Sequence, residues 1–421
     1  MSANRERWRW QELRTVLGPG VLLAAAAIGG SHLVASTQAG AIYGLGLLAL
    51  VIMANLLKYP FMLVGTRFTA ATGISLLEGY KIQNRFYLPL FLVITLATGV
   101  ANIAAVTMIA GGLATTLLPG EASLWSLVLL GISLLVLLFG HYRSLDRISK
   151  VIVALLVLCT VLATAMALIS GPAAGVVDFF QPSPWTWASL PFLVALMGWM
   201  PCPLDLAAWS SLWIFAREHD SGQRGTQEAI EADFNLGYAV TALMAVLFLL
   251  LGAWTMHGTG EQFSPQGGAF ADQLIELYTL NIGVWAKPWI ALMAFITMAS
   301  TTITCLDGYP RSTSAGVRLL RGKRGHAVQN HADQQRWILL HAALAGGVLL
   351  IWPGAMRPLV EAAMIVSFLT TPVLAWMNLD LMQGRQVRPA NRFQPPMVLL
   401  AQVGLLVLLS FTVLFVLSRI L

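Results

Sequence analysis

The sequence predicts an all-α protein that crosses a membrane many times. Hydrophobic residues make up 57% of the 421 residues and charged residues only 10%, whereas a soluble domain carries roughly a quarter charged residues. Apolar runs of about 20 residues, the length that spans a bilayer as a helix, recur from end to end without a long polar block. We therefore expect one transmembrane domain over residues 18–421.

The apolar runs define eleven predicted spanning helices, each bounded by short polar or basic segments. They cover residues 18–43, 45–67, 88–117, 123–140, 149–170, 187–214, 235–256, 286–306, 336–353, 358–380 and 395–419. Residues 1–17 hold four arginines but no short apolar core with a small-residue cleavage site, which argues against a signal peptide. We expect them to form a cytoplasmic N-terminal segment on the lipid surface.

Basic residues predict the orientation of the chain. With the N-terminus in the cytoplasm, the cytoplasmic segments hold all of the 25 basic residues except Lys58, Lys287, Arg357 and Arg419. Such a bias is typical of cytoplasmic loops, and we expect a multi-pass protein of a bacterial inner (plasma) membrane. The basic residues form no aromatic-interleaved face, so we expect the lipid bilayer and no nucleic acid as a partner. Lys58 lies inside the second span, and we expect it to snorkel to the interface.

Enzyme motifs are missing from the sequence. It contains no glycine-rich phosphate loop before a lysine, no Gly-x-Ser-x-Gly and no His-Glu-x-x-His. The three cysteines have unrelated spacing and predict neither a disulfide framework nor a zinc site. We expect no enzyme, no cofactor and no nucleotide-driven pump.

Two of the predicted spans are interrupted. The first contains Gly29-Gly30, and the sixth contains Pro201 and Pro203. Glycine costs roughly 1 kcal/mol in a helix, and proline removes a backbone donor. In lipid, freed backbone groups are tolerated only where they line a cavity or are buried in protein. Each interruption alone also fits a simple kink, but breaks at matching positions of two five-helix halves indicate a transporter site.

Several short motifs resemble the NRAMP family of divalent-metal transporters. They are Leu17-Gly18-Pro19-Gly20, Gln38-Ala39-Gly40-Ala41, Ala71-Thr72-Gly73, Leu77-Glu78-Gly79-Tyr80 and Met200-Pro201. The resemblance implies the LeuT-type fold. In that fold, two inverted five-helix repeats, here about residues 18–170 and 187–380, are followed by one extra helix, about 395–419.

The chain departs from the family at the first break. The family motif there reads Asp-Pro-Gly-Asn, but Gly29 stands at the Asp position and His32 at the Asn position. The resemblance implies that Met200 supplies a thioether ligand and Met197 a carbonyl ligand. Cys202 stands where the family usually has a histidine, and the acidic residues of the family's third helix have no counterpart in span three.

These residues define a candidate substrate site of Gly29, His32, Met197, Met200 and Cys202. His32, Met200 and Cys202 are the candidate metal ligands. Imidazole, thioether and thiol form a soft set that suits copper, zinc or another late transition metal better than manganese, magnesium or calcium.

Three ionisable residues are candidates for coupling or gating. His32, with an unperturbed pKa of about 6.5, can carry a coupling proton, or it can be a packed polar residue bonded to a neighbouring helix. Asp205 either faces the site or caps a helix start, and we favour the cap. Asp307 either lines an ion route or joins Arg311 in a cytoplasmic Asp–Arg network, which we favour.

The sequence thus predicts an NRAMP-like secondary transporter, such as a symporter, that moves a divalent metal cation by alternating access with altered selectivity or coupling. A LeuT-type carrier of a small organic solute is one alternative, because the first-helix Asp is lost. A non-transporting membrane sensor on the same scaffold is another.

Overall fold

The computed structural model describes residues 18–139, 142–173, 181–222, 225–323 and 330–420, and these residues are largely helical without a β-strand. The predicted cytoplasmic segment 1–17 lies outside them. The helical elements in chain order are α2 (Pro19–Ala27), η1 (Ser31–Ser36), α3 (Thr37–Tyr43), η2 (Gly44–Leu47), α4 (Leu48–Thr72), α5 (Leu76–Gln83), α6 (Tyr87–Ala114), α7 (Ala122–Leu138), α8 (Tyr142–Ser170), α9 (Leu190–Trp199), α10 (Leu206–Ser221), α11 (Gln227–Thr255), α12 (Gly267–Ile282), η3 (Val284–Ala286), α13 (Lys287–Leu320), α14 (His331–Ile351), α15 (Met356–Gln383), η5 (Pro389–Asn391) and α16 (Pro395–Ile420).

Each predicted span coincides with a helix or with a broken series of helices. Among the described residues, six helical segments are long and apolar enough to cross a bilayer: Ser31–Thr72, Tyr87–Ala114, Gln227–Thr255, Val284–Leu320, Met356–Gln383 and Pro395–Ile420. Spans one and six are the interrupted ones: the first is divided among α2, η1 and α3, and the sixth between α9 and α10. The all-helical membrane architecture predicted from the apolar runs is confirmed.

Two helices were not expected from the sequence. The short α5 begins after Ser75, whose hydroxyl accepts from the amide of Glu78 at 3.1 Å, as an N-cap residue does. The amphipathic α12 lies between the predicted seventh and eighth spans and carries Asp272 and Glu276. One helix is too short and the other too polar to register as a span.

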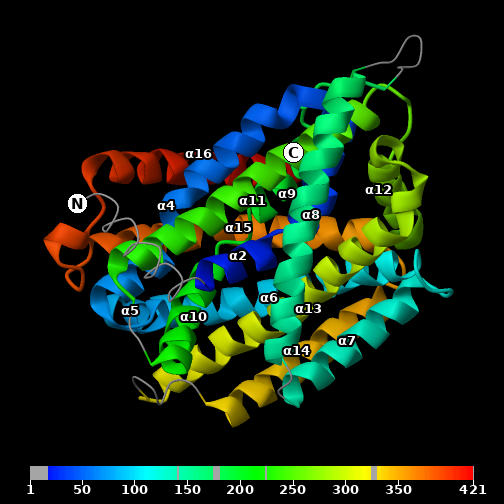
Figure 1. The fold of residues 1–421 in the computed structure, drawn as a ribbon. Helices are drawn as coiled ribbons and strands as arrows, with labels where there is room; N and C mark the ends of the chain where they lie inside the picture. The colour runs from blue at the N-terminus through cyan, green and yellow to red at the C-terminus, as the bar shows by residue number, and fades with distance from the viewer. Residues whose placement is uncertain (1–17, 140–141, 174–180, 223–224, 324–329, 421) are drawn as a thin grey trace, which may run out of the picture.

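The first helix lies in the interior of the molecule, where α10, α11 and α13 surround it (Figure 1). Its N-terminus is anchored by α11: the carboxylate of Asp233 accepts from the amide of Gly20 at 2.6 Å. The backbones also touch, because a Cβ added at Gly237 would lie 2.1 Å from the carbonyl oxygen of Gly20. Helices α2 and α11 therefore approach to a distance that only glycine permits at this point.

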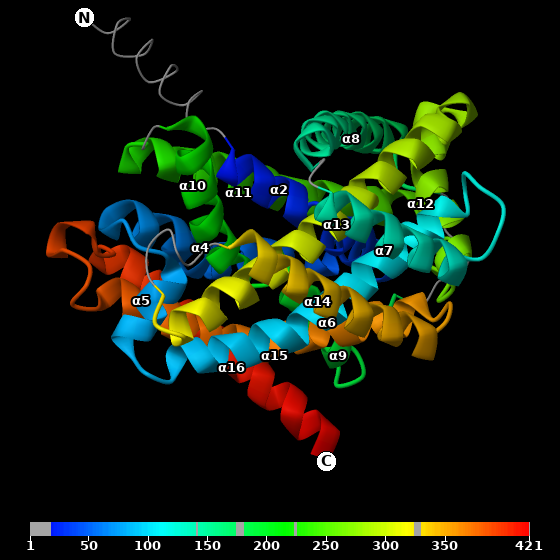
Figure 2. The same cartoon turned by 90° about the horizontal axis from the view of Figure 1, so that it is seen from below.

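The last helix, α16, lies at the edge of the bundle (Figure 2). It packs against α4, α9 and α15, and only 22% of its most apolar stretch is buried within the protein. A helix so apolar and so exposed has lipid as its remaining partner. This matches the prediction of one extra helix outside the two halves.

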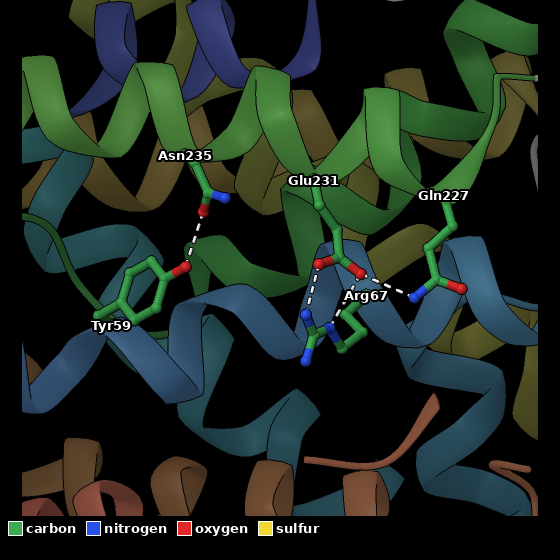
Figure 3. A network of polar contacts seen from close by, with 5 residues as sticks. All are labelled: Tyr59, Arg67, Gln227, Glu231 and Asn235. Carbon is green, nitrogen blue, oxygen red and sulfur yellow. Dashed lines mark hydrogen bonds and ion pairs between the residues drawn. The ribbon is translucent and has the colours of Figure 1, made fainter. Parts of the chain in front are cut away.

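Polar contacts join α4 to α11 (Figure 3). Arg67 makes a bidentate pair with Glu231, with N–O distances of 2.9 and 2.5 Å, and Gln227 donates to the same carboxylate at 2.8 Å. About one turn further along α11, Asn235 accepts from the hydroxyl of Tyr59 at 2.8 Å. These contacts fix α4 relative to α11.

We predict that Gly237→Ala destabilises the protein by about 1–3 kcal/mol, because the added methyl overlaps the carbonyl of Gly20 and separates two packed backbones. Thermal unfolding in detergent measures the change. Gly347→Ala is the matched control, since a Cβ there meets no heavy atom of the described residues within 4 Å. Equal melting temperatures for the two variants would contradict the packing argument.

Candidate substrate site at two broken helices

The first break separates α2 from η1 at residues 28–30. Ile28 has ψ 80°, which ends the helix, and the chain resumes as a π-helix at Ser31. The carbonyl of Ala27 accepts from the hydroxyl of Ser31 at 2.8 Å and lies 2.9 Å from Nδ1 of His32. Side chains of the next turn therefore replace the helical partner that this carbonyl has lost.

The second break separates α9 from α10. Met200 is extended, with φ −89° and ψ 120°, and helical structure resumes only at Leu206. The carbonyl of Met197 would bond the amide of residue 201 in a continuous helix, but residue 201 is a proline and has no N–H. Pro201 therefore leaves the carbonyl of Met197 without its usual helical hydrogen bond.

The two breaks face each other, as the sequence predicted. The hydroxyl of Ser31 lies 3.3 Å from the carbonyl oxygen of Pro201, and the hydroxyl of Ser36 lies 4.0 Å from Sδ of Met200. Gly30 packs on the indole of Trp199, so closely that a Cβ would lie 2.5 Å from the ring. Residues from both broken helices therefore share one buried junction.

His32 is fully buried in this junction and its ring is held on both sides. Nε2 lies 2.9 Å from the carbonyl oxygen of Thr241 on α11, and Nδ1 lies 2.7 Å from the hydroxyl of Ser31. Nε2 donates to the carbonyl of Thr241, and Nδ1 has both the hydroxyl of Ser31 and the carbonyl of Ala27, 2.9 Å away, as hydrogen-bonding neighbours. The ring nitrogens thus bond within the protein in this arrangement, and the roles of His32 as metal ligand and proton carrier stay predictions.

Met197, Met200 and Cys202 are also buried at the junction. The carbonyls of Met197 and Cys202 accept from the ammonium of Lys58, at 2.8 and 3.1 Å. Among the described residues, no group of three or more His, Cys, Asp or Glu side chains is placed to hold a metal. A metal at this junction would need the sulfur of Met200 or backbone oxygens as well.

Lys58 corrects one expectation. It does not snorkel to an interface: it is fully buried, and its ammonium also donates to the carbonyl of Gly198 at 2.9 Å. The reason is that the break in the sixth span exposes backbone acceptors inside the protein, and an ammonium has three donors to match them. The sequence signal was the charge itself, in the middle of an apolar span.

Asp205 occupies the N-cap position of α10, but its side chain makes no capping hydrogen bond. The favoured expectation that Asp205 lies at a helix start is met by its position, but its carboxylate does not make the capping hydrogen bond. The carboxylate is buried, and Oδ2 accepts from the hydroxyl of Thr98 on α6 at 2.7 Å because the unwound segment turns it into the bundle. Within the described part of the chain, Oδ1 has no hydrogen-bond partner.

Asp307 lies away from the breaks and makes the Asp–Arg pair that we favoured. Its two oxygens accept from Nε and Nη2 of Arg311 at 3.0 and 2.8 Å, and Gln334 on α14 donates to Oδ1 at 2.8 Å. These bonds tie α13 to α14. A gating role for Asp307 stays a prediction.

Asn102 is a buried hub that the sequence analysis did not include in the site. Its amide donates to the hydroxyl of Tyr309 at 2.6 Å and to Ser367 at 3.2 Å, and Oδ1 accepts from the indole N–H of Trp199 at 2.9 Å. The hub joins α6, α9, α13 and α15 beside the second break. An amide inside an apolar span was the only sequence signal for it.

Comparison with known proteins identifies the family. The model of the natural resistance-associated macrophage protein-like (Nramp) family matches residues 20–418. The chain belongs to the NRAMP family. An uncharacterised protein of Pasteurella multocida is 40% identical over 98% of this chain and 94% of its own length. The divalent metal cation transporter MntH of Latilactobacillus sakei is 23% identical over 69% of this chain and 65% of its own length.

Solved structures support the NRAMP assignment at the level of the fold. The Eremococcus coleocola manganese transporter, in complex with an aromatic bis-isothiourea substituted compound, has a TM-score of 0.70 at 14% identity, over 97% of this chain and 87% of that one. The nucleobase-cation-symport-1 family transporter MHP1 has a TM-score of 0.57 at 15% identity, over 96% and 90% of the two chains. The predicted LeuT-type fold is confirmed.

We predict that Asn102→Ala destabilises this NRAMP protein by about 1–3 kcal/mol, because the indole N–H of Trp199 is left buried and unpaired. Asn281→Ala is the control, since among the residues that the structure describes the Asn281 amide donates only to the carbonyl of Leu277, in its own helix. Thermal unfolding of both variants in detergent measures the difference. An Asn102→Ala variant no less stable than the control would show that the hydrogen bonds of the hub do not stabilise the fold.

Proposed function

We propose that this protein is a secondary transporter that moves a divalent metal cation across a bacterial inner membrane by alternating access. Membership of the NRAMP family supports the proposal, as does the likeness to relatives named divalent metal cation transporters. The observation that carries it is the meeting of the two breaks, where Ser31 contacts Pro201 and Ser36 contacts Met200. Freed backbone groups and side chains of both helices converge there, as a midplane substrate site requires.

The proposed architecture is a single transmembrane domain over residues 18–421 with the N-terminus in the cytoplasm. The halves 18–170 and 187–380 each begin with a broken helix, and residues 395–419 form the extra helix. Contacts between the helix ends that we assign to the cytoplasmic side support this topology. Arg67 and Glu231, which the charge bias puts near the cytoplasmic face, pair with each other. Lys81, also on that side, donates to the carbonyl of Leu319 after the eighth span.

The donor set at the junction favours a soft cation. Met200 supplies a thioether, Cys202 a thiol and His32 an imidazole, while position 29, where the family has Asp, is glycine. Thioether, thiol and imidazole prefer late transition metals, and manganese, magnesium and calcium prefer oxygen. We therefore propose zinc, copper or a similar ion as cargo rather than manganese.

One observation favours a second candidate, a carrier of a small organic solute with a negative charge. Lys58 places a buried ammonium on the second break, and no carboxylate at position 29 opposes it. A positive site repels a divalent cation and attracts an anionic group. The thermal-stability measurements described next, with metals and with organic acids as ligands, distinguish this candidate from the metal transporter.

We predict that zinc or cadmium raises the melting temperature of the purified protein, and that Met200→Ala abolishes the rise. At a concentration 100-fold above Kd, a ligand stabilises by about 2.7 kcal/mol. His32→Ala lowers the starting stability in any case, since the ring bonds Thr241, but it removes the metal-dependent rise only if His32 is a ligand. His341→Ala is the control, because within the described part of the chain that buried histidine bonds only the carbonyl of Trp337, in its own helix. Stabilisation by organic acids and by no metal would overturn the proposal in favour of the second candidate.

We predict that Gly29→Asp creates manganese affinity, since it restores an anionic oxygen ligand at the first break. A Cβ at position 29 would lie 3.1 Å from Oγ1 and Cγ2 of Thr301, so the paired change Gly29→Asp with Thr301→Ala relieves the contact. Gly29→Ala with Thr301→Ala is the control for shape without charge. Manganese titration calorimetry measures the gain. A folded double variant that binds manganese no better than its control would show that position 29 does not face the cargo.

A further inference from the structure

The ammonium of Lys58 lies in a cradle of three backbone carbonyls. Nζ donates to Met197 at 2.8 Å, Gly198 at 2.9 Å and Cys202 at 3.1 Å, and the side chain is fully buried. An ammonium has three N–H groups, and each has one acceptor here. We call the oxygens of Met197, Gly198 and Cys202 the carbonyl cradle.

The sequence builds this cradle from the break itself. The carbonyl of Met197 has no helical partner because residue 201 is proline, and the carbonyl of Gly198 loses its partner because the chain leaves the helix at Met200. The carbonyl of Cys202 lacks its helical partner because the amide of Leu206, four residues further on, bonds to the carbonyl of Pro203 instead. Converging carbonyls with no N–H partners are also the usual backbone site for a cation in a broken membrane helix.

We propose that the carbonyl cradle is a cation site which the protein fills with its own lysine, and that a free cation can replace this ammonium there. Resting on the proposed function, the inference adds that the cargo metal competes with Lys58 for these oxygens. Two positive charges cannot share them, because neither the cradle nor position 29 supplies an anion. Lys58 then sets the cation specificity of the site, because only a cation that binds these oxygens more tightly than the ammonium does can replace it.

Nearby charge supports the exchange. The carboxylate of Asp205, three residues beyond Cys202, interacts electrostatically with the ammonium of Lys58. Within the described residues its Oδ1 accepts no hydrogen bond. A buried charge without a counter-charge is strongly unfavourable, and the carboxylate of Asp205 offers the displaced ammonium a counter-charge.

The decisive variant is Lys58→Ala, tested with n-propylammonium as the probe. Truncation at Cβ removes three carbons and the ammonium, which is the volume and charge of that ion. We expect Lys58→Ala to melt below the wild type, and millimolar propylammonium to restore its melting temperature without affecting the wild type. Propanol, of similar shape but neutral, controls for simple filling of the cavity. Lys81→Ala is the matched control, because Lys81 also donates to a backbone carbonyl but far from the breaks.

The second measurement is cadmium binding by the wild type, Lys58→Ala and Lys58→Met, with calorimetry as the readout. Competition predicts that both variants bind cadmium about tenfold or more tightly than the wild type, since no tethered charge must be displaced. Rescue by propylammonium with unchanged cadmium affinity would overturn the competition. Rescue with no cadmium binding by any of the three proteins would keep the cation cradle and count against the metal function.

Failure of the cradle itself has its own signature. If propylammonium and propanol act equally on Lys58→Ala, the lysine merely fills space and the inference is wrong. Should Lys58→Ala be lost during purification, it is prepared again with propylammonium present throughout. Recovery of folded protein only with the amine supports the cradle, and loss under both conditions overturns it.

Discussion

The need to satisfy every backbone polar group inside a bilayer governs this structure. Unpaired N–H and C=O groups are very unfavourable in lipid, yet two helices are interrupted in the middle of the protein. The protein meets the demand with side chains. Ser31 and His32 reach the carbonyl of Ala27 at the first break, and Lys58 reaches three carbonyls at the second. The breaks persist because these particular groups complete them.

Helix α11 carries this local chemistry into the packing of the bundle. The carbonyl of Thr241 holds the ring of His32, and the hydroxyl of Tyr238 donates to the carbonyl of Asn55, one turn before Lys58. Further along, Glu231 pairs with Arg67 on α4. One helix thus positions both side chains that complete the breaks. A displacement of α4 relative to α11 would therefore act on both breaks together, which is the kind of linkage that alternating access needs.

Sequence alone predicted the parts that depend on local backbone chemistry. Apolar runs gave the spans, and paired glycines and prolines gave both breaks, because their effect is written into the residues themselves. Lys58 was misjudged, and the partner of Asp205 was missed, because their environments come from distant segments. The acceptors of Lys58 lie about 140 residues away, and Asp205 bonds Thr98 on α6. Asp307 was judged correctly because its partner, Arg311, is one turn away on the same helix.

The charged groups at the junction differ from those that the family pattern implies. Glycine replaces the acid at position 29, and a buried ammonium lies on the carbonyls opposite. Such a site accepts only two kinds of cargo. A cation must displace the ammonium, which then needs Asp205 or water as its new partner, whereas an anion can bind beside the ammonium as it stands. Both routes depend on Lys58 more directly than on His32, whose ring nitrogens already bond Ser31 and Thr241. The selectivity of this family member therefore depends on a lysine from the second helix rather than on the motif of the first.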